Sequence, residues 1–211
     1  MESIDAHKVA SKLKLLDVFR KQGKHEQKRS RLPPGQRVTP GFPVLDLGIK
    51  PAMDLMTWKL RIFGAVRKEL NVSLDELKKL GVQHYTKDFH CVTTWSKYDV
   101  KWTGIPFKKI IEFAQPDPNW KHVIQFGKDG YSTNAPRADI ERDDAFLAFE
   151  LDGKPIPREH GYVRLIIPHL YAWKTSKFLT AIEFSLEDKP GYWETRGYHN
   201  RGNAMLEERY S

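Results

Sequence analysis

The residues best suited to carry chemistry surround the single cysteine of this 211-residue chain. Cys91 ends a predicted strand and is followed by a run of aromatic, hydroxyl and lysine side chains. His90, Lys97 and Lys101 lie close to it in sequence, and nearby positive charge favours the thiolate form that acts as a nucleophile or metal ligand. A lone cysteine can equally be a small buried hydrophobic residue. The local sequence leaves both interpretations open.

A second polar cluster lies in a turn after a late apolar strand and contains Lys174, Thr175, Ser176 and Lys177. Lysine supplies point charge and hydroxyls supply oriented donors, so such a turn suits an anion. A basic loop exposed to water is the alternative. The stretch 127–136, which is rich in glycine and hydroxyls, is predicted to be a loop.

Several function classes lack their motifs. The chain contains no Gly-x-Gly-x-x-Gly after a strand, no phosphate-binding P-loop and no His-Glu-x-x-His, and its eight histidines do not pair at metal-ligand spacing. One cysteine forms neither an internal disulfide nor a cysteine-rich zinc site. The N-terminus lacks an export signal, and no apolar run reaches the roughly 18–20 residues of a membrane span. We expect a cytoplasmic protein with no membrane partner.

The positive charge is concentrated at the start of the chain. Residues 1–37 carry ten Lys and Arg against four Asp and Glu, which accounts for +6 of the net charge of +8. This distribution predicts a basic arm over 1–37, with an amphipathic helix over 5–22, and one domain over 38–211. The arm is either a solvated extension or a docking segment for an acidic partner.

The elements that must position these residues are short strands with few helices between them. The spacing of apolar residues and turn residues predicts strands over 43–48, 57–66, 82–94, 121–126, 146–151, 163–167 and 177–185, and helices after Ser73 and over 107–114. Ser73 and Glu76 form a predicted capping box. This order indicates an α+β domain with mixed sheets rather than a doubly wound parallel sheet.

Taken together, the motifs resemble the sulfite oxidase family of molybdopterin enzymes, in particular its small haem-free bacterial branch. The resemblance runs from about residue 40 to the C-terminus, and it rests on the order of the segments 90–96, 102–106, 129–133, 147–161, 164–168, 171–177 and 190–199. It implies a sulfite oxidase-type fold and a molybdenum–molybdopterin cofactor without haem. It also implies two-electron oxygen-atom transfer on a small oxyanion or an S- or N-oxide.

The resemblance also implies roles for individual residues. Cys91 would be the molybdenum ligand, Tyr131 would lie near the substrate, and Lys101 would take the place of an arginine that binds the anionic substrate. The residues implied to contact the cofactor are Phe42, Ser132, Thr133, His160, Arg164, Lys174, Ser176 and Lys177. A separate redox protein would exchange the electrons, since no haem domain precedes the body.

Two interpretations from other classes remain. Lysines and aromatic residues alternate between Trp95 and Phe107, which is typical of a module that binds anions or single-stranded nucleic acid, with Cys91 as a structural residue. The other interpretation is a thiol enzyme with Cys91 as nucleophile. Molybdenum in the purified protein would favour the redox enzyme over both.

Overall fold

The computed structural model describes Ala10 and residues 31–211, so the predicted helix over 5–22 lies, except for Ala10, outside the described residues. In chain order the elements are β1 Arg37–Val38, β2 Lys59–Gly64, β3 Leu70–Ser73, α2 Leu74–Lys78, β4 Gln83–Cys91, β5 Trp95–Pro106, α3 Phe107–Ala114, β6 His122–Gly127, β7 Ser132–Pro136, α4 Arg137–Ile140, β8 Phe146–Leu151, β9 Lys154–Pro155, η1 Arg158–His160, β10 Arg164–Ile166, η2 Ala172–Lys174, β11 Leu179–Ser185 and η3 Glu194–Arg196. The predicted α+β class with mixed sheets and short helices is confirmed.

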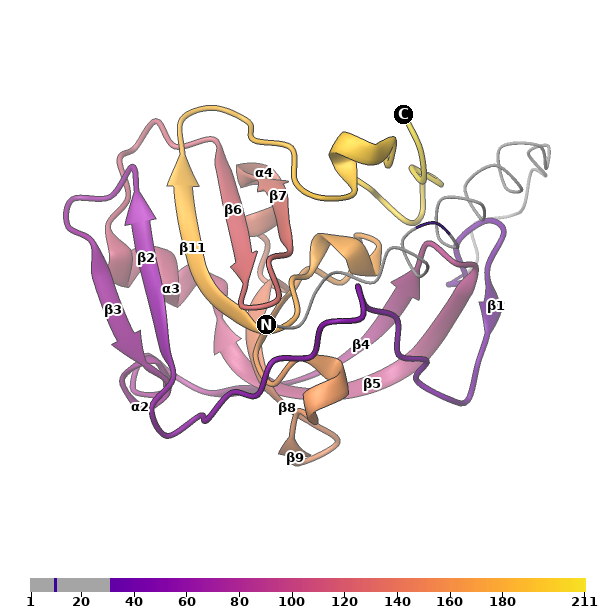
Figure 1. The fold of residues 1–211 in the computed structure, drawn as a ribbon, viewed down its shortest axis with the longest axis horizontal. Helices are drawn as coiled ribbons and strands as arrows, with labels where there is room; N and C mark the ends of the chain where they lie inside the picture. The colour runs from indigo at the N-terminus through magenta and orange to yellow at the C-terminus, as the bar shows by residue number, and fades with distance from the viewer. Residues whose placement is uncertain (1–9, 11–30) are drawn as a thin grey trace.

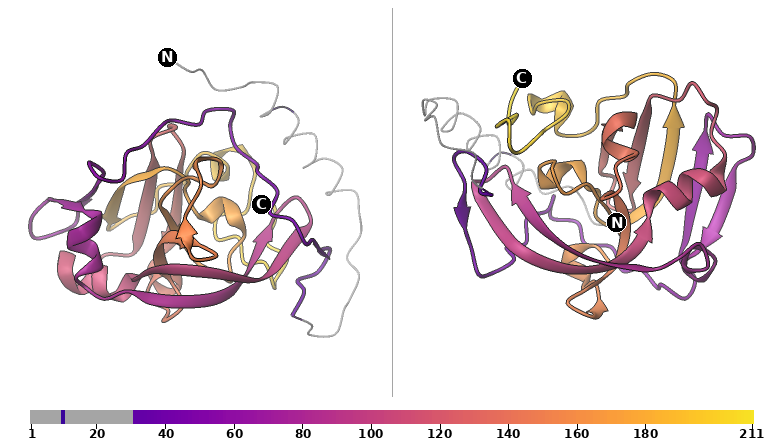
Figure 2. Two further views of the ribbon diagram at one scale, coloured as in Figure 1. Left: turned by 90° about the horizontal axis from the view of Figure 1, so that it is seen from below. Right: turned by 180° about the vertical axis from the view of Figure 1, so that it is seen from behind.

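The strands form two sheets (Figure 1). One has the order β3-β2-β11-β6-β7, in which β2 and β11 are parallel and the other pairs antiparallel. The other has the order β1-β5-β8-β10, with β4 paired to β5 and β9 to β8. The long β4–β5 hairpin runs along the bottom of the molecule in the view from behind, and the C-terminal tail lies above the end of the hairpin there (Figure 2, right).

Two apolar clusters fill the interior. The larger packs α2 and α3 against the two sheets and includes fully buried Leu60, Ile62 and Phe107. The second is rich in aromatic residues, contains Cys91 and joins the β4–β5 hairpin to the tail through Trp193 and Tyr198. The cysteine therefore lies where segments distant in sequence meet.

Local sequence signals worked well in the first half of the chain. The capping box is present, with the Ser73 hydroxyl accepting from the Glu76 amide and the Glu76 carboxylate accepting from the Ser73 amide at 2.8 Å. Helix α3 begins at Phe107 and ends at Ala114, as predicted. Strand β4 delivers Cys91 at its end.

Two predictions of local structure were wrong. Residues 43–48 form no strand, because Asp46 accepts a hydrogen bond from the Gly48 amide at 2.8 Å and closes a turn there. The predicted loop 127–136 contains β7, a strand whose Thr133 and Asn134 are buried because the tail supplies their hydrogen-bond partners. Hydropathy could not indicate a buried strand made of polar residues.

The predicted boundary between arm and body falls inside β1, which pairs in parallel with β5. Arg31 forms ion pairs with Asp88 and Asp99, so the described part of the arm contacts the body. Among the described residues, no helix is both long and apolar enough to cross a bilayer.

Candidate molybdenum-cofactor site

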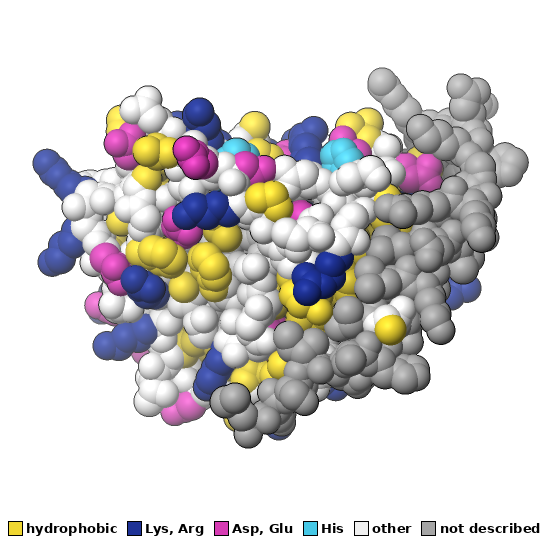
Figure 3. All heavy atoms as spheres, turned by 45° about the horizontal axis from the view of Figure 1, so that its top comes forward, with side chains coloured by type: hydrophobic (Ala, Val, Ile, Leu, Met, Phe, Trp, Pro, Cys, Tyr) yellow, Lys and Arg dark blue, Asp and Glu magenta, His cyan; other side chains and the backbone are white. Residues whose placement is uncertain are grey.

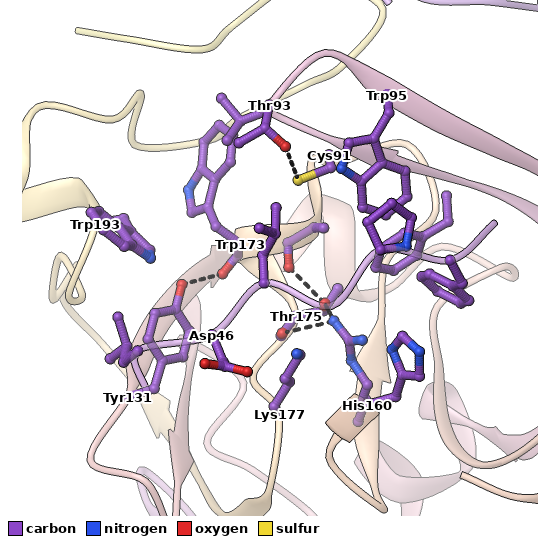
Figure 4. Close-up of a pocket in the computed structure, with 18 of the residues that line it drawn as sticks. Asp46, Cys91, Thr93, Trp95, Tyr131, His160, Trp173, Thr175, Lys177 and Trp193 are labelled. Carbon is purple, nitrogen blue, oxygen red and sulfur yellow. Dashed lines mark hydrogen bonds between the residues drawn. The ribbon is translucent and has the colours of Figure 1, made fainter. Parts of the chain in front are cut away.

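Cys91 opens into a pocket between the β4–β5 hairpin, the irregular segment 42–47 and the C-terminal tail (Figure 4). The pocket holds about 760 Å³ of space free of atoms, part of it open to solvent. Cys91 is 7% exposed, and its Sγ lies 3.1 Å from the Thr93 hydroxyl in the turn after β4. A hydroxyl at this distance can donate to a thiolate and stabilise its charge.

Two positively charged residues line this pocket: Arg164 on β10 and Lys177 in the turn before β11. Arg164 is 3% exposed, and its Nη2 donates to the Thr175 hydroxyl at 2.5 Å. The Lys177 ammonium donates to the Glu159 carbonyl at 2.8 Å and also lines the pocket. Burial, followed by the charges of Arg164 and Lys177, lowers the pKa of His160 to about 4, so its imidazole is neutral at pH 7.

Three buried N–H groups of the pocket residues have no partner within the described part of the chain. They are Arg164 Nε, Trp95 Nε1 and Trp173 Nε1, on residues no more than 7% exposed. Buried donors in native proteins are nearly always hydrogen bonded. A guest rich in acceptor atoms, such as a pterin phosphate, would supply their partners. Together with a thiol able to ligate a soft metal, this donor set fits a molybdenum–molybdopterin group.

The pocket also contains carboxylates and a phenol. Asp46 and Asp129 line it, and burial raises the pKa of Asp129 to about 6. The Tyr131 hydroxyl donates to the Trp173 carbonyl, and its pKa lies well above the usual value because of burial and the charge of Glu194. Tyr131 is therefore a neutral hydrogen-bond donor at neutral pH, and its ring forms part of the wall.

Lys174 makes internal contacts instead of lining the pocket. Its side chain is fully buried outside the pocket lining, and its Nζ donates to Glu194 at 2.5 Å, Asn134 at 2.6 Å and the Asn200 carbonyl at 2.7 Å. An ammonium has three donors, so all are used and none remains for a cofactor phosphate. Burial lowers the pKa of Lys174, and Glu194 opposes that effect. The buried ion pair already satisfies the charge of Lys174, so the geometry does not favour the predicted cofactor contact, which stays a prediction.

Four further predicted residues do not line the pocket: Lys101, Ser132, Thr133 and Ser176. Lys101 is exposed because it alternates along β5 with buried Val100 and Trp102 and so faces the opposite side of the strand. The Thr133 hydroxyl donates to Glu194 at 2.6 Å, and the Ser176 amide donates to Gln125. The roles predicted for these four residues stay predictions that the pocket geometry does not favour. The other predicted residues, Phe42, Cys91, Tyr131, His160, Arg164 and Lys177, do meet in the pocket.

More than half of the residues that line the pocket were not predicted from the sequence. The lining residues that it did not name as site residues are Pro43, Leu45, Asp46, Leu47, Phe89, Val92, Thr93, Trp95, Asp129, Ala172, Trp173, Thr175, Trp193 and Tyr198. Thr175 could have been found, since it stands between two predicted contacts. Trp193 and Tyr198 could not, because their place depends on how the tail folds back.

The geometry does not favour the rival interpretations. Trp95 and Trp102 are 6% and 2% exposed, so their rings are not available to stack on bases. Charges of both signs are interspersed over the described surface drawn in Figure 3. The hydrogen-bond partner of the Cys91 thiol is Thr93, while the neighbouring His90 ring pairs with Ser96 at 2.8 Å, so no cysteine–histidine pair forms within the described residues.

Comparison with known proteins supplies the family. A model described as an oxidoreductase molybdopterin binding domain matches residues 47–193. The uncharacterized oxidoreductase YuiH of Bacillus subtilis is 38% identical over 183 residues, which cover 86% of this chain and 92% of YuiH. The catalytic subunit MsrP of a protein-methionine-sulfoxide reductase from Campylobacter jejuni is 28% identical over 161 residues, covering 67% of this chain and 54% of MsrP.

A solved structure shares the fold. The sulfane dehydrogenase SoxCD from Paracoccus pantotrophus matches with a TM-score of 0.61 at 19% identity, over 67% of this chain and 41% of the SoxCD chain. The chain thus spans nearly all of YuiH but only about half of MsrP. With a family model over most of its length and a molybdopterin-suited pocket around Cys91, the chain belongs to the sulfite oxidase-like family of molybdopterin-dependent oxidoreductases.

Proposed function

We propose that this enzyme transfers oxygen atoms to or from a small oxyanion or an S- or N-oxide, with Cys91 as the protein ligand of molybdenum. The observation that carries the proposal is the position of the thiol in a pocket whose buried N–H donors lack acceptors among the described residues. The methionine-sulfoxide reductase relatives support an S-oxide as the oxidised form of the substrate. A cytoplasmic location and a separate redox partner are part of the same proposal.

The pocket residues divide the work between binding and positioning. The bound cofactor supplies two-electron redox chemistry at molybdenum. Cys91 holds the metal, and the Thr93 hydroxyl 3.1 Å away stabilises the sulfur. Arg164, Trp95 and Trp173 offer N–H donors to the pterin and its phosphate, and Lys177 adds positive charge.

One polar group on the pocket wall, Asp129, is suited to proton transfer. Removing an oxygen atom from an S-oxide as water consumes two electrons and two protons. Asp129 has a pKa of about 6, which suits proton delivery near neutral pH. Tyr131 and His160 remain neutral there, so they add no charge to the pocket wall, and the Tyr131 hydroxyl is held in place by its hydrogen bond to the Trp173 carbonyl.

Elemental analysis tests the metal assignment. The full chain is produced in a host that makes the cofactor, and molybdenum is measured in wild type, Cys91→Ala and Lys101→Ala. We expect about one molybdenum per wild-type chain, as a single thiolate ligand implies. The Cys91→Ala variant should lose turnover with artificial electron donors, while Lys101→Ala should match wild type because Lys101 is exposed outside the pocket. A wild-type protein without molybdenum, or an active Cys91→Ala variant, would overturn the proposal.

Comparing substrates tests the reaction. Reduction of methionine sulfoxide and of trimethylamine N-oxide is measured with reduced viologen dye, and oxidation of sulfite with ferricyanide. Turnover in one of these assays that is lost in Cys91→Ala supports oxygen-atom transfer. A molybdenum-loaded protein that is inactive in all three would refute the proposed reaction class.

A further inference from the structure

The turn that carries Cys91 is held by two side chains and one backbone amide from segments far away in the sequence. The Cys91 carbonyl accepts from the Gln36 side-chain amide at 2.9 Å and from the Thr94 amide at 3.1 Å. The Val92 carbonyl accepts from Arg209 Nη1 at 2.6 Å. The Thr94 carbonyl accepts from the Arg37 amide at 2.9 Å. Three of the four carbonyls between Cys91 and Thr94 are thus bound by residues 36–37 and 209.

Arg209 also joins the two segments to each other. Its Nη2 donates to the Pro34 carbonyl at 2.8 Å, 175 positions away, and the residue is 5% exposed. Its guanidinium lies 5.0 Å from the centre of the Tyr171 ring. Gly35, with φ +65°, allows this approach, since a Cβ there would lie 3.2 Å from Arg209 Nη2. A planar guanidinium bridging two carbonyls is a rigid link.

The turn needs these contacts because one of its residues, Thr94, has an unfavourable backbone conformation. Thr94 has φ 71°, a left-handed conformation that costs free energy for a β-branched residue. Such a conformation persists when the surrounding structure over-determines it. Here the surrounding structure consists of Gln36, Arg37 and Arg209, and the turn fixes where the Cys91 sulfur and the Thr93 hydroxyl point.

We infer that Arg209 and Gln36 are positioning residues for the Cys91 thiol. This inference rests on the proposed function of Cys91 as metal ligand and deepens it: the C-terminal tail and the segment 34–37 clamp the ligand turn from outside the pocket. Neither side chain lines the pocket, so the effect passes through the backbone of the turn.

The test compares Arg209→Gln with Arg201→Gln in the full-length holoenzyme. Arg201 is a matched control because it also anchors the tail, donating twice to Asp139 at 2.8 Å, but does not touch the turn. Hydrogen exchange is followed for peptides covering residues 91–97 and 34–39, together with molybdenum content and the Mo(V) electron paramagnetic resonance spectrum. Arg209→Lys and Gln36→Leu complete the set.

We expect Arg209→Gln to raise exchange at the Thr94 and Arg37 amides about tenfold, through local opening, and to change the Mo(V) spectrum. Arg201→Gln should leave both within about twofold of wild type, since its lost contacts lie elsewhere. Arg209→Lys, which can keep one carbonyl contact, should fall between them. Equal effects of Arg209→Gln and Arg201→Gln would overturn the inference, because general loosening of the tail would then explain both.

The experiment has a second set of variants and a readout that is separate from enzyme activity. If Arg209→Gln does not fold, Arg209→Lys and Gln36→Leu carry the test, and unchanged exchange and spectrum in both overturn the inference. Hydrogen exchange can be measured whether or not the protein contains molybdenum. A wild type without molybdenum therefore refutes the proposed function, whereas exchange at the Thr94 and Arg37 amides that these substitutions leave unchanged refutes the positioning role.

Discussion

Replacing Lys174 with methionine separates the structural role that we assign to this lysine from the cofactor contact that the sequence indicated. The change keeps the length of an apolar stem and removes the ammonium. Glu194 then loses its 2.5 Å ion pair, and two further acceptors, Asn134 Oδ1 and the Asn200 carbonyl, lose their donor. Glu194 retains the Thr133 hydroxyl on one oxygen, while its other oxygen already lacks a partner among the described residues.

The size of the effect follows from burial. The side chains of Lys174 and Glu194 are 0% and 1% exposed. Breaking a buried pair by removing one partner costs about 3–5 kcal/mol, because it leaves an uncompensated buried charge. In a domain of this size each kcal/mol lowers the unfolding temperature by about 2–4 °C, so a fall of about 10 °C is expected.

Thermal unfolding followed by circular dichroism measures this effect, alongside molybdenum content. Adding Glu194→Gln to Lys174→Met removes both charges and should recover about half of the lost free energy, because replacing a buried pair by neutral groups is often tolerated. Lys189→Met is the matched control: it breaks the more exposed pair with Glu183 and should cost at most about 1 kcal/mol.

A different result would refute this reasoning. If Lys174→Met unfolds at the wild-type temperature but loses molybdenum, the ammonium binds the cofactor and the pair with Glu194 contributes little. If the double variant is less stable than Lys174→Met, the two side chains are not coupled as the contacts indicate.

Three further predictions concern charge around the pocket. Lys101→Ala should change neither the unfolding temperature nor KM, because the side chain faces solvent on β5; a tenfold rise in KM for an anionic substrate would contradict this. Asp129→Asn should stabilise the protein above pH 6 and match wild type below pH 4 in unfolding experiments, because a carboxyl whose folded pKa is raised to about 6 is destabilising when charged. His160 has a folded pKa of about 4, below its unfolded value of about 6.5. Its contribution to the free energy of unfolding is therefore fully present above pH 6.5 and is lost as the pH falls towards 4. His160→Asn should therefore show a weaker loss of stability over this range, and an unchanged slope would argue against a buried neutral imidazole.

Local signals in the sequence were sufficient where neighbouring residues determine the structure. The Ser73–Glu76 capping box and the helix after Pro106 depend on contacts within a few residues. The strand that carries Cys91 was predicted too, although its pairing with β5 reaches from Gln83 to Gly104. The order of short motifs also pointed to the correct family, since each motif keeps its place in the chain. The order of the motifs was therefore enough to predict that Cys91 and Lys177, from two distant segments, belong to one site.

The pocket wall was decided by tertiary structure. Lys174 and Lys177 lie three positions apart in one basic turn, yet one is buried in an ion pair and the other lines the pocket. Composition cannot distinguish them, because the difference comes from Glu194, which the tail brings to Lys174 from 20 positions away. The sequence alone indicated the family, proposed Cys91 as the metal ligand and located six of the eleven described strands. The folded tail decided which charges are neutralised and which face the pocket, because buried charge is stable only where long-range contacts supply its partners.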